Sequence, residues 1–297
     1  MMVFEWQADE ALLTRTFLKH RGISRRLLSR IKFHGGQILV NGQEENVRHQ
    51  LTVGDKVTVI LPNEGKQEII EAIHLPIDIL FEDDHYIAVN KPAGYTSIPS
   101  QYNPQGSMAN ILKAYYQRQD YDNQVIHVVT RLDRDTSGVM LFAKHAFAHG
   151  LIDQQMQQKG IEKTYLAVSD KKVSDLDHGF IDDPIARSPR SIIERRVHES
   201  GQSALTEYWL AEQVGALKVY KVQLHTGRTH QIRVHMSYLG HPLAGDFLYG
   251  EELPGILSRP ALHSAELSFC HPITKKQMKF TQPMPPDMRN LLQAFSP

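Results

Sequence analysis

The order of strand-like and helix-like segments after residue 74 most constrains the fold of this 297-residue chain. Seven short runs rich in β-branched and aromatic residues are typical of strands, and four longer segments have the apolar spacing of helices. The expected strands are 77–83, 86–90, 139–144, 164–168, 204–212, 218–224 and 262–269, and the expected helices are 107–119, 146–158, 228–239 and 286–295. Because strands and helices do not alternate strictly, we expect an α+β fold with a mixed, largely antiparallel sheet decorated by helices and loops.

The first 62 residues have a different pattern and predict a small α-β domain. Apolar residues at helical spacing begin at Leu12, and a second helical run follows Ser24, which is suited to be its N-cap. Two strand-like runs, 37–42 and 56–62, come next, and an Asn-Gly turn signal closes the first. The polar stretch 63–74 has the composition of a linker. The predicted organisation is a small domain at 1–62, a linker at 63–74 and a large domain at 75–297.

Charge is concentrated in the small domain, although the formal net charge of the whole chain is zero. Between Arg15 and Lys32 there are seven basic residues and no acidic one. Such a cluster creates a local positive field that attracts phosphates without sequence preference. A solvated helix face is the alternative interpretation of the same pattern. The candidate RNA contacts in this region are Arg21, Arg25, Arg26 and Lys32.

The composition also limits where the protein works. Cys270 is the single cysteine, so no disulfide framework or multi-cysteine zinc site can form within the chain, which suits a reducing cytosol. The N-terminal residues lack a basic region followed by an apolar run, and no stretch approaches the roughly 18 apolar residues of a membrane span. We therefore expect a cytoplasmic protein with no membrane association and no obligate protein partner.

A dense polar turn, RLDRDTSG at 131–138, lies between two strand-like runs. As a structural turn it would use Asp135, Thr136 and Ser137 to satisfy backbone donors, and Gly138 could take a positive φ angle. That interpretation does not explain why two carboxylates, Asp133 and Asp135, each follow an arginine so closely.

The turn resembles the signature of the RluA-type pseudouridine synthases, in which the aspartate after Arg-Leu is the nucleophile. The resemblance implies that Asp133 has this role here. Four further segments, 82–94, 163–168, 224–250 and 262–272, are similar to other family motifs and follow in the family's order. They imply Tyr165 and Arg228 as further active-site residues. Two positions differ from the usual family pattern: Thr130 stands where a histidine is frequent, and SIPS at 97–100 where His-Pro is frequent.

The N-terminal sequence from about 12 to 62 resembles a second family, the αL RNA-binding motif. Together the two resemblances imply a pseudouridine synthase that isomerises specific uridines in structured RNA, either ribosomal or transfer RNA. Two alternatives stay open from the residues: an RNA-directed N-glycosidic hydrolase and a non-catalytic RNA-binding protein.

The implied reaction suits these residue types. Detaching uracil from the sugar calls for a carboxylate that attacks or stabilises the sugar carbon. A nearby arginine favours the ionised form of a carboxylate in a dry pocket, and Arg228 is the family-matched candidate. Tyr165 offers a flat ring for the detached base. Because a stacked uridine must be flipped out of the RNA, Arg131 could fill the vacated space or bind a flanking phosphate, or it could be an ordinary salt-bridging arginine.

No metal or cofactor is predicted. His225, His230 and His235 are five residues apart, a spacing that puts ligands on opposite sides of a strand and well apart around a helix. A zinc site needs three or four convergent ligands, and no cysteine is near.

Overall fold

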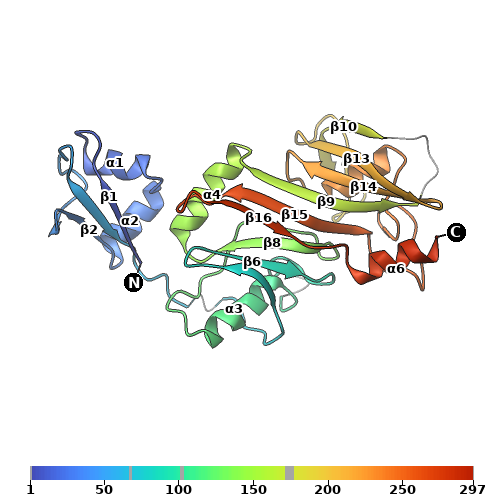
Figure 1. Ribbon diagram of the computed structural model, residues 1–297, viewed down its shortest axis with the longest axis horizontal. Coiled ribbons are helices and arrows are strands. Elements are labelled where there is room, and N and C mark those ends of the chain that lie inside the picture. The colour runs from blue at the N-terminus through green and yellow to red at the C-terminus, as the bar shows by residue number, and fades with distance from the viewer. Residues whose placement is uncertain (1, 67–68, 101–103, 171–176, 297) are drawn as a thin grey trace.

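The computed structural model describes residues 2–66, 69–100, 104–170 and 177–296. Residues 67–68 of the predicted linker therefore lie outside the described part of the chain. The described residues form a small N-terminal sheet, a ten-stranded sheet and a two-stranded ribbon, together with six helices (Figure 1). No described helix has both the length and the apolar character needed to cross a lipid bilayer.

The N-terminal unit is a four-stranded antiparallel sheet covered by two short helices. Its strands have the order β1-β4-β2-β3, and Ser24 caps the second helix by accepting a hydrogen bond from the Leu27 backbone N–H at 3.2 Å. The first strand was not anticipated from the sequence, because only Phe4 and Trp6 of its five residues are partly buried. The elements are β1 (Val3–Gln7), α1 (Thr14–His20), α2 (Arg25–Phe33), β2 (Gln37–Val40), β3 (Gln43–Glu44) and β4 (Lys56–Ile60).

The large sheet has the order β10-β13-β14-β9-β15-β8-β6-β5, with β16 paired to β15 and β7 paired to β8. Every pairing is antiparallel except the one between β8 and β15, so the expected mixed, largely antiparallel sheet is confirmed. The strands are β5 (Asp78–Glu82), β6 (Tyr86–Lys91), β7 (His127–Val128), β8 (Ser137–Ala143), β9 (Ile161–Ser169), β10 (His178–Asp182), β13 (Leu205–Val214), β14 (Leu217–Leu224), β15 (Leu262–Cys270) and β16 (Gln277–Thr281). A separate ribbon pairs β11 (Ile185–Arg187) with β12 (Arg195–Val197).

Four helices accompany the large sheet, each within a segment where the sequence predicts one. They are α3 (Met108–Arg118), α4 (Ala146–Gln157), α5 (Gln231–Tyr238) and α6 (Pro286–Ala294). The third of them begins three residues later than expected, because His230 at its N-cap has a left-handed backbone with φ +58°. In Figure 1, α4 lies at the end of the sheet that faces the N-terminal unit, and α6 lies at the opposite end, next to the C-terminus.

The N-terminal unit packs against α4 through aromatic side chains. Phe147 belongs to the same buried cluster as the core of the small sheet. Its ring centroid lies 4.7 Å from that of Phe4 and 6.2 Å from that of Trp6. Glu64 of the expected linker adds polar contacts, since it binds His127 at 2.8 Å and accepts a hydrogen bond from the Ala146 backbone N–H at 2.7 Å. These contacts join the unit to the large sheet, while the domain boundaries at 62 and 75 stay a prediction.

Candidate active site

The loop between β7 and β8, residues 129–136, carries Asp133 and is held through its backbone. The Ser97 hydroxyl donates to the Leu132 carbonyl at 2.7 Å and accepts from the Leu132 N–H at 2.9 Å. Within the loop, the Thr136 N–H donates to the Asp133 carbonyl at 3.2 Å. The residue just before Asp133 is therefore fixed on both sides of its backbone by one buried serine, which lies in the segment where the sequence departs from the family pattern.

Charged side chains hold the next two carbonyls of this loop. The Lys91 ammonium donates to the Arg134 carbonyl at 2.8 Å, and the Gly94 N–H donates to the same oxygen at 3.0 Å. Arg259 donates to the Asp135 carbonyl at 3.1 Å. Burial lowers the pKa of Lys91 to about 7, against the opposing charges of Asp135 and Asp133. A buried lysine thus lies beneath the turn and next to its two carboxylates.

Gly138, the second residue of β8, lies just after the loop at a place where only glycine fits. Its φ is +113°, as the turn interpretation anticipated, and strand β15 crosses it closely. A Cβ at this position would meet the Ser264 carbonyl oxygen at 2.1 Å. The close approach aligns the start of β8 with β15 and so determines where the Asp133 loop emerges from the sheet.

The register of three strands brings Tyr165 towards Asp133. Gly138 on β8 is opposite Ser264 on β15, and Ser264 is in turn opposite Tyr165 on β9. Tyr165 is buried, with 6% of its surface exposed. Burial raises the pKa of its hydroxyl, and the negative charge of Asp133 raises it further. The tyrosine is therefore a neutral, apolar-walled ring within the electrostatic range of the carboxylate.

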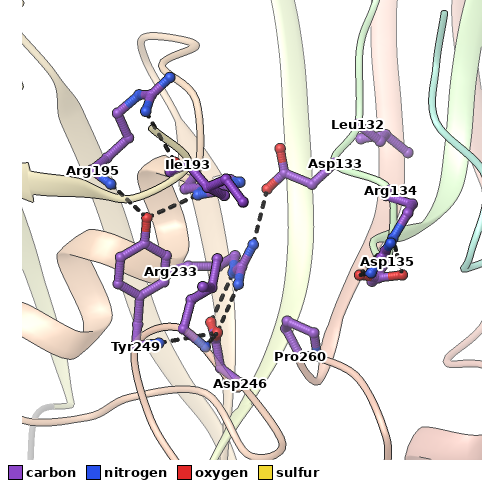
Figure 2. A network of polar contacts seen from close by, with 12 residues as sticks. Leu132, Asp133, Arg134, Asp135, Ile193, Arg195, Arg233, Asp246, Tyr249 and Pro260 are labelled. Atoms are coloured by element: carbon purple, nitrogen blue, oxygen red, sulfur yellow. Dashed lines mark hydrogen bonds and ion pairs between the residues drawn. The ribbon is translucent and has the colours of Figure 1, made fainter. Parts of the chain in front are cut away.

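Arg233 on α5 is the cation next to Asp133. Figure 2 shows its guanidinium between two carboxylates, with Asp246 on one side and Asp133 on the other. Nε and Nη2 donate to the two oxygens of Asp246 at 2.8 and 2.7 Å, while Nη1 lies 4.0 Å from Asp133 Oδ2. Burial lowers the pKa of Arg233, but the hydrogen bonds and charge of Asp246, followed by the charge of Asp133, outweigh that effect and raise it.

Arg228 does not take the place that the sequence analysis expected for it. Its Nε donates to the Ser203 carbonyl at 2.9 Å, and its backbone N–H donates to the side chain of Gln231. The reason is local: α5 begins only at Gln231, so Arg228 lies in the preceding turn, whereas Arg233 lies on the buried face of the helix. The partner of Asp133 among the described residues is therefore Arg233.

The expected RNA contacts are distributed over two surfaces. Arg131, two residues before Asp133, is exposed. On the N-terminal unit, Arg25 and Arg26 are exposed in the first turn of α2, and Lys32 is exposed near its end. Arg21 is instead half-buried, paired with Asp9 at 3.0 Å. The structure thus leaves three of the four N-terminal cations turned towards solvent and pairs the fourth.

The three histidines at five-residue spacing have separate partners. His225 binds Glu207 at 2.9 Å, His230 binds the Tyr249 hydroxyl at 2.8 Å, and His235 binds the Thr206 hydroxyl at 2.9 Å. Within the described ranges, no group of three or more His, Cys, Asp or Glu side chains could hold a metal ion.

Comparison with known proteins decides the family. The RNA pseudouridylate synthase family model matches residues 85–238, a span that includes the Asp133 loop, Tyr165 and Arg233. An uncharacterized RNA pseudouridine synthase of Bacillus subtilis, YjbO, is 46% identical over 92% of this chain and 95% of its own. The chain belongs to the RNA pseudouridine synthase family. Among other relatives of this enzyme, the ribosomal large subunit pseudouridine synthase D of Xanthomonas campestris is 34% identical over 88% of this chain and 81% of that protein.

Solved structures agree on the fold of the synthase. Human RNA pseudouridylate synthase domain containing 1 superposes with a TM-score of 0.60 at 24% identity, covering 75% of this chain and 89% of that one. The family model and the relatives at 34–46% identity confirm the RluA-type resemblance of the sequence motifs. Sequence reasoning missed Arg233, Asp246 and Lys91. Their signal was present, since all three lie in segments that match the family motifs, but spacing does not show which side chains point towards Asp133.

Proposed function

We propose that this synthase isomerises uridines in structured ribosomal RNA, with Asp133 as the nucleophile, Tyr165 as the platform for the base and Arg233 as the counter-charge. The observation that carries the proposal is the buried Arg233, held 4.0 Å from Asp133, while the backbone of the Asp133 loop is fixed from several directions. Ribosomal RNA is favoured over transfer RNA because several relatives, at 34–35% identity, are named ribosomal large subunit synthases.

The reaction needs no redox change and no external energy. The bond between the sugar C1′ and uracil N1 breaks, and its electron pair stays with the uracil. A carboxylate oxygen of Asp133 bonds to C1′ or stabilises its positive charge. The uracil turns over the Tyr165 ring until its C5 faces C1′ and forms the new bond. Loss of the hydrogen from C5 as a proton then restores the aromatic ring.

Arg233 supports this step through fixed charge. Asp246 is fully buried and binds two of the guanidinium nitrogens, so the arginine cannot swing away. Its third nitrogen faces Asp133, and the cation favours the ionised carboxylate that the attack requires. Because Asp133, Asp246 and Arg233 are already in place, little reorganisation accompanies the reaction.

The N-terminal unit supplies the second RNA contact in this proposal. Helix α2 has no acidic residue in its first turn but places two arginines there, Arg25 and Arg26. Cations at a helix N-terminus oppose the helix dipole at a cost of about 0.3–1 kcal/mol each. Bound phosphate would offset that cost, which favours an RNA-binding role over a solvated helix face. We also infer a cytoplasmic enzyme, which agrees with ribosomal RNA as the proposed substrate.

Mapping pseudouridine in ribosomal and transfer RNA, from cells with and without the protein, tests the activity and the substrate together. We expect a site in ribosomal RNA that disappears with the protein and returns with the wild-type chain but not with Asp133→Asn. The purified variant should keep RNA affinity within a few-fold, because phosphate contacts supply most of the affinity. Retention of more than about a few per cent of the wild-type rate would remove Asp133 from its role.

RNA with 5-fluorouridine at the target position separates the synthase from its two alternatives. Fluorine cannot leave C5 as a cation, so a synthase yields a fluorinated isomer or a long-lived complex through Asp133. A hydrolase releases free fluorouracil and leaves an abasic site, and a non-catalytic RNA-binding protein returns the RNA unchanged. Intact-mass analysis distinguishes the three outcomes, and stoichiometric release of fluorouracil would replace the synthase with the hydrolase.

A further inference from the structure

His230 combines an unusual backbone with a fixed side chain beside the active site. It is one of five described non-glycine residues with a positive φ, and it forms the N-cap of the helix that carries Arg233. Left-handed backbone is strained in a non-glycine residue and is concentrated at functional sites. The Nδ1 atom of His230 lies 2.8 Å from the Tyr249 hydroxyl. The proposed reaction above gives this histidine no role.

The hydrogen bonds of the Tyr249 hydroxyl favour one tautomer of His230. That hydroxyl accepts a hydrogen bond from the Arg195 backbone N–H at 2.8 Å, as Figure 2 shows. Its own hydrogen has one acceptor among the described residues, the Nδ1 atom of His230. A neutral imidazole that accepts at Nδ1 carries its hydrogen on Nε2. The described part of the chain offers Nε2 no hydrogen-bond partner, so this donor is available to a ligand.

The ring stays neutral near two carboxylates. Burial lowers the pKa of His230, and the charges of Arg233 and Arg195 act in the same direction. The charges of Asp133 and Asp246 raise the pKa but do not overcome burial. Tyr249, whose hydroxyl binds His230, also has its ring 5.0 Å from the Arg233 guanidinium, so the histidine lies beside the cation that faces Asp133. A neutral histidine can donate a hydrogen bond here without competing with Arg233 for the Asp133 carboxylate.

We propose that His230 donates a hydrogen bond from Nε2 to a carbonyl oxygen of the target uracil while the glycosidic bond breaks. This inference rests on the proposed function. When C1′ attaches to Asp133, the departing uracil holds the electron pair of the broken bond, and that negative charge spreads from N1 onto the carbonyl oxygens O2 and O4. A neutral donor aimed at such an oxygen stabilises the developing anion, and no proton needs to be transferred. Tyr249 acts through His230 and is a positioning residue.

Two variants test the pair. His230→Asn keeps the backbone, because asparagine tolerates left-handed φ, but its shorter side chain does not reach the Nε2 position. We expect the single-turnover rate with saturating enzyme to fall about a hundredfold, with RNA affinity within twofold of wild type. Tyr249→Phe keeps the ring that lies 5.0 Å from the Arg233 guanidinium and removes only the hydroxyl, so its rate should fall about tenfold. His225→Asn in the same segment is the matched control and should stay within about twofold of wild type.

The double variant shows whether the two residues act as one unit. If Tyr249 works only by holding His230, the combination of His230→Asn with Tyr249→Phe is no slower than His230→Asn alone. If the rate of the double variant instead falls by the product of the two single-variant factors, that result would contradict the positioning role of Tyr249. A His230→Asn rate within twofold of wild type would contradict the role of His230.

Modified RNA identifies the atom that His230 contacts. Sulfur is a weaker hydrogen-bond acceptor than oxygen, so 2-thiouridine or 4-thiouridine at the target position should slow the wild-type enzyme. In the His230→Asn variant, sulfur in place of the oxygen that His230 contacts should cause no additional slowing. If both thio-uridines slow the variant as much as wild type, and only a phosphorothioate beside the target loses its effect, then His230 binds phosphate and the inference fails.

The outcome for Asp133→Asn keeps the inference separable from the proposed function. An active Asp133→Asn enzyme overturns the proposed function itself. An inactive Asp133→Asn enzyme together with a fully active His230→Asn enzyme overturns only the inference about His230.

Discussion

Asp246 determines what Arg233 can do. A guanidinium has five N–H donors in a rigid plane, and a buried carboxylate that binds two of them fixes the orientation of the rest. Here Asp246 accepts from Nε and Nη2 and also from the backbone N–H of Leu248 and Tyr249, so neither charge of the pair is left without partners. The remaining Nη1 faces Asp133 across 4.0 Å, which is a charge interaction rather than a hydrogen bond.

Substituting the two arginines of this segment distinguishes their roles. Arg233→Gln removes the charge beside Asp133 and leaves Asp246 buried without its partner, so we expect turnover to fall at least about a thousandfold. Arg228→Gln removes a contact with the Ser203 carbonyl and should change turnover less than about tenfold. The comparison uses single-turnover rates of the two variants, after circular dichroism has shown that each variant is folded. Equal losses in the two variants would contradict the assignment of the counter-charge to Arg233.

Lys91 should make the stability of the protein depend on pH in an alkaline window. Burial lowers its pKa to about 7 in the folded protein, whereas an exposed lysine in the unfolded chain has a pKa of about 10.4. Between these values the unfolded chain binds more protons, so the free energy of unfolding rises with pH. Below pH 7 both states are charged and the full cost of burying the ammonium is present.

Lys91→Met provides the test of that dependence. Denaturant unfolding at several pH values from 7 to 10 should give a shallower rise in the free energy of unfolding for Lys91→Met than for wild type. Replacement of the exposed Lys32 by methionine is the control and should leave the wild-type slope intact. Parallel slopes for wild type and Lys91→Met would show that Lys91 titrates normally.

At the scale of elements, the Asp133 loop is placed by contacts with separate parts of the chain. The end of β6 contributes Lys91, the turn that follows contributes Gly94 and Ser97, and the segment before β15 contributes Arg259. Each of these four residues binds a backbone group of the loop, so the conformation of the loop does not depend on its own side chains. This arrangement explains why a polar turn near the surface can hold a carboxylate in one position.

Ser97→Ala should loosen that loop specifically. The substitution removes both hydrogen bonds to the Leu132 backbone, and we expect turnover to fall about tenfold, equivalent to roughly 1.4 kcal/mol of barrier, with RNA affinity unchanged. Ser107→Ala is the matched control, because Ser107 is equally buried but caps α3. Its loss should lower stability by about 1 kcal/mol without changing turnover below the unfolding temperature. If both substitutions change only stability, the hydrogen bonds of Ser97 to the Leu132 backbone have no role in positioning Asp133.

The same elements show what the sequence could and could not predict. The apolar run within 139–144 was assigned correctly because β8 is buried on both faces, and such a strand requires apolar residues throughout. The ribbon strands β11 and β12 have three residues each and too few apolar positions for a periodic signal. The expected pairing of Arg228 with Asp133 is not seen in the structure. The left-handed backbone of His230 delays the start of α5, and a sequence does not reveal φ.

At the scale of the whole molecule, the N-terminal unit is anchored rather than loosely tethered. Phe4 and Trp6 pack on Phe147 of α4, and Arg30 of α2 lies 3.5 Å from Glu64, which also binds His127. Burial raises the pKa of Glu64, but its bonds to His127, to Ala146 N–H and to Arg30 outweigh this effect and lower it to about 2. The pair of basic helices therefore keeps a defined position relative to the Asp133 loop, as the proposed binding of one RNA to both requires.

Arg25→Gln combined with Arg26→Gln measures the contribution of this unit to RNA binding. Both side chains are exposed, so their replacement removes two charges without disturbing the packing against Phe147. Each phosphate neutralised contributes roughly 0.7–0.9 to the slope of log affinity against log salt, so the slope should become shallower by about 1.4–1.8. Turnover at saturating RNA should stay close to wild type, because neither residue touches the Asp133 loop.

Lys275→Gln with Lys276→Gln removes the same charge from the exposed turn before β16 and should leave the slope unchanged. Equal changes in the two double variants would reveal a general charge effect, and an unchanged slope in the Arg25 and Arg26 variant would show that α2 does not contact RNA.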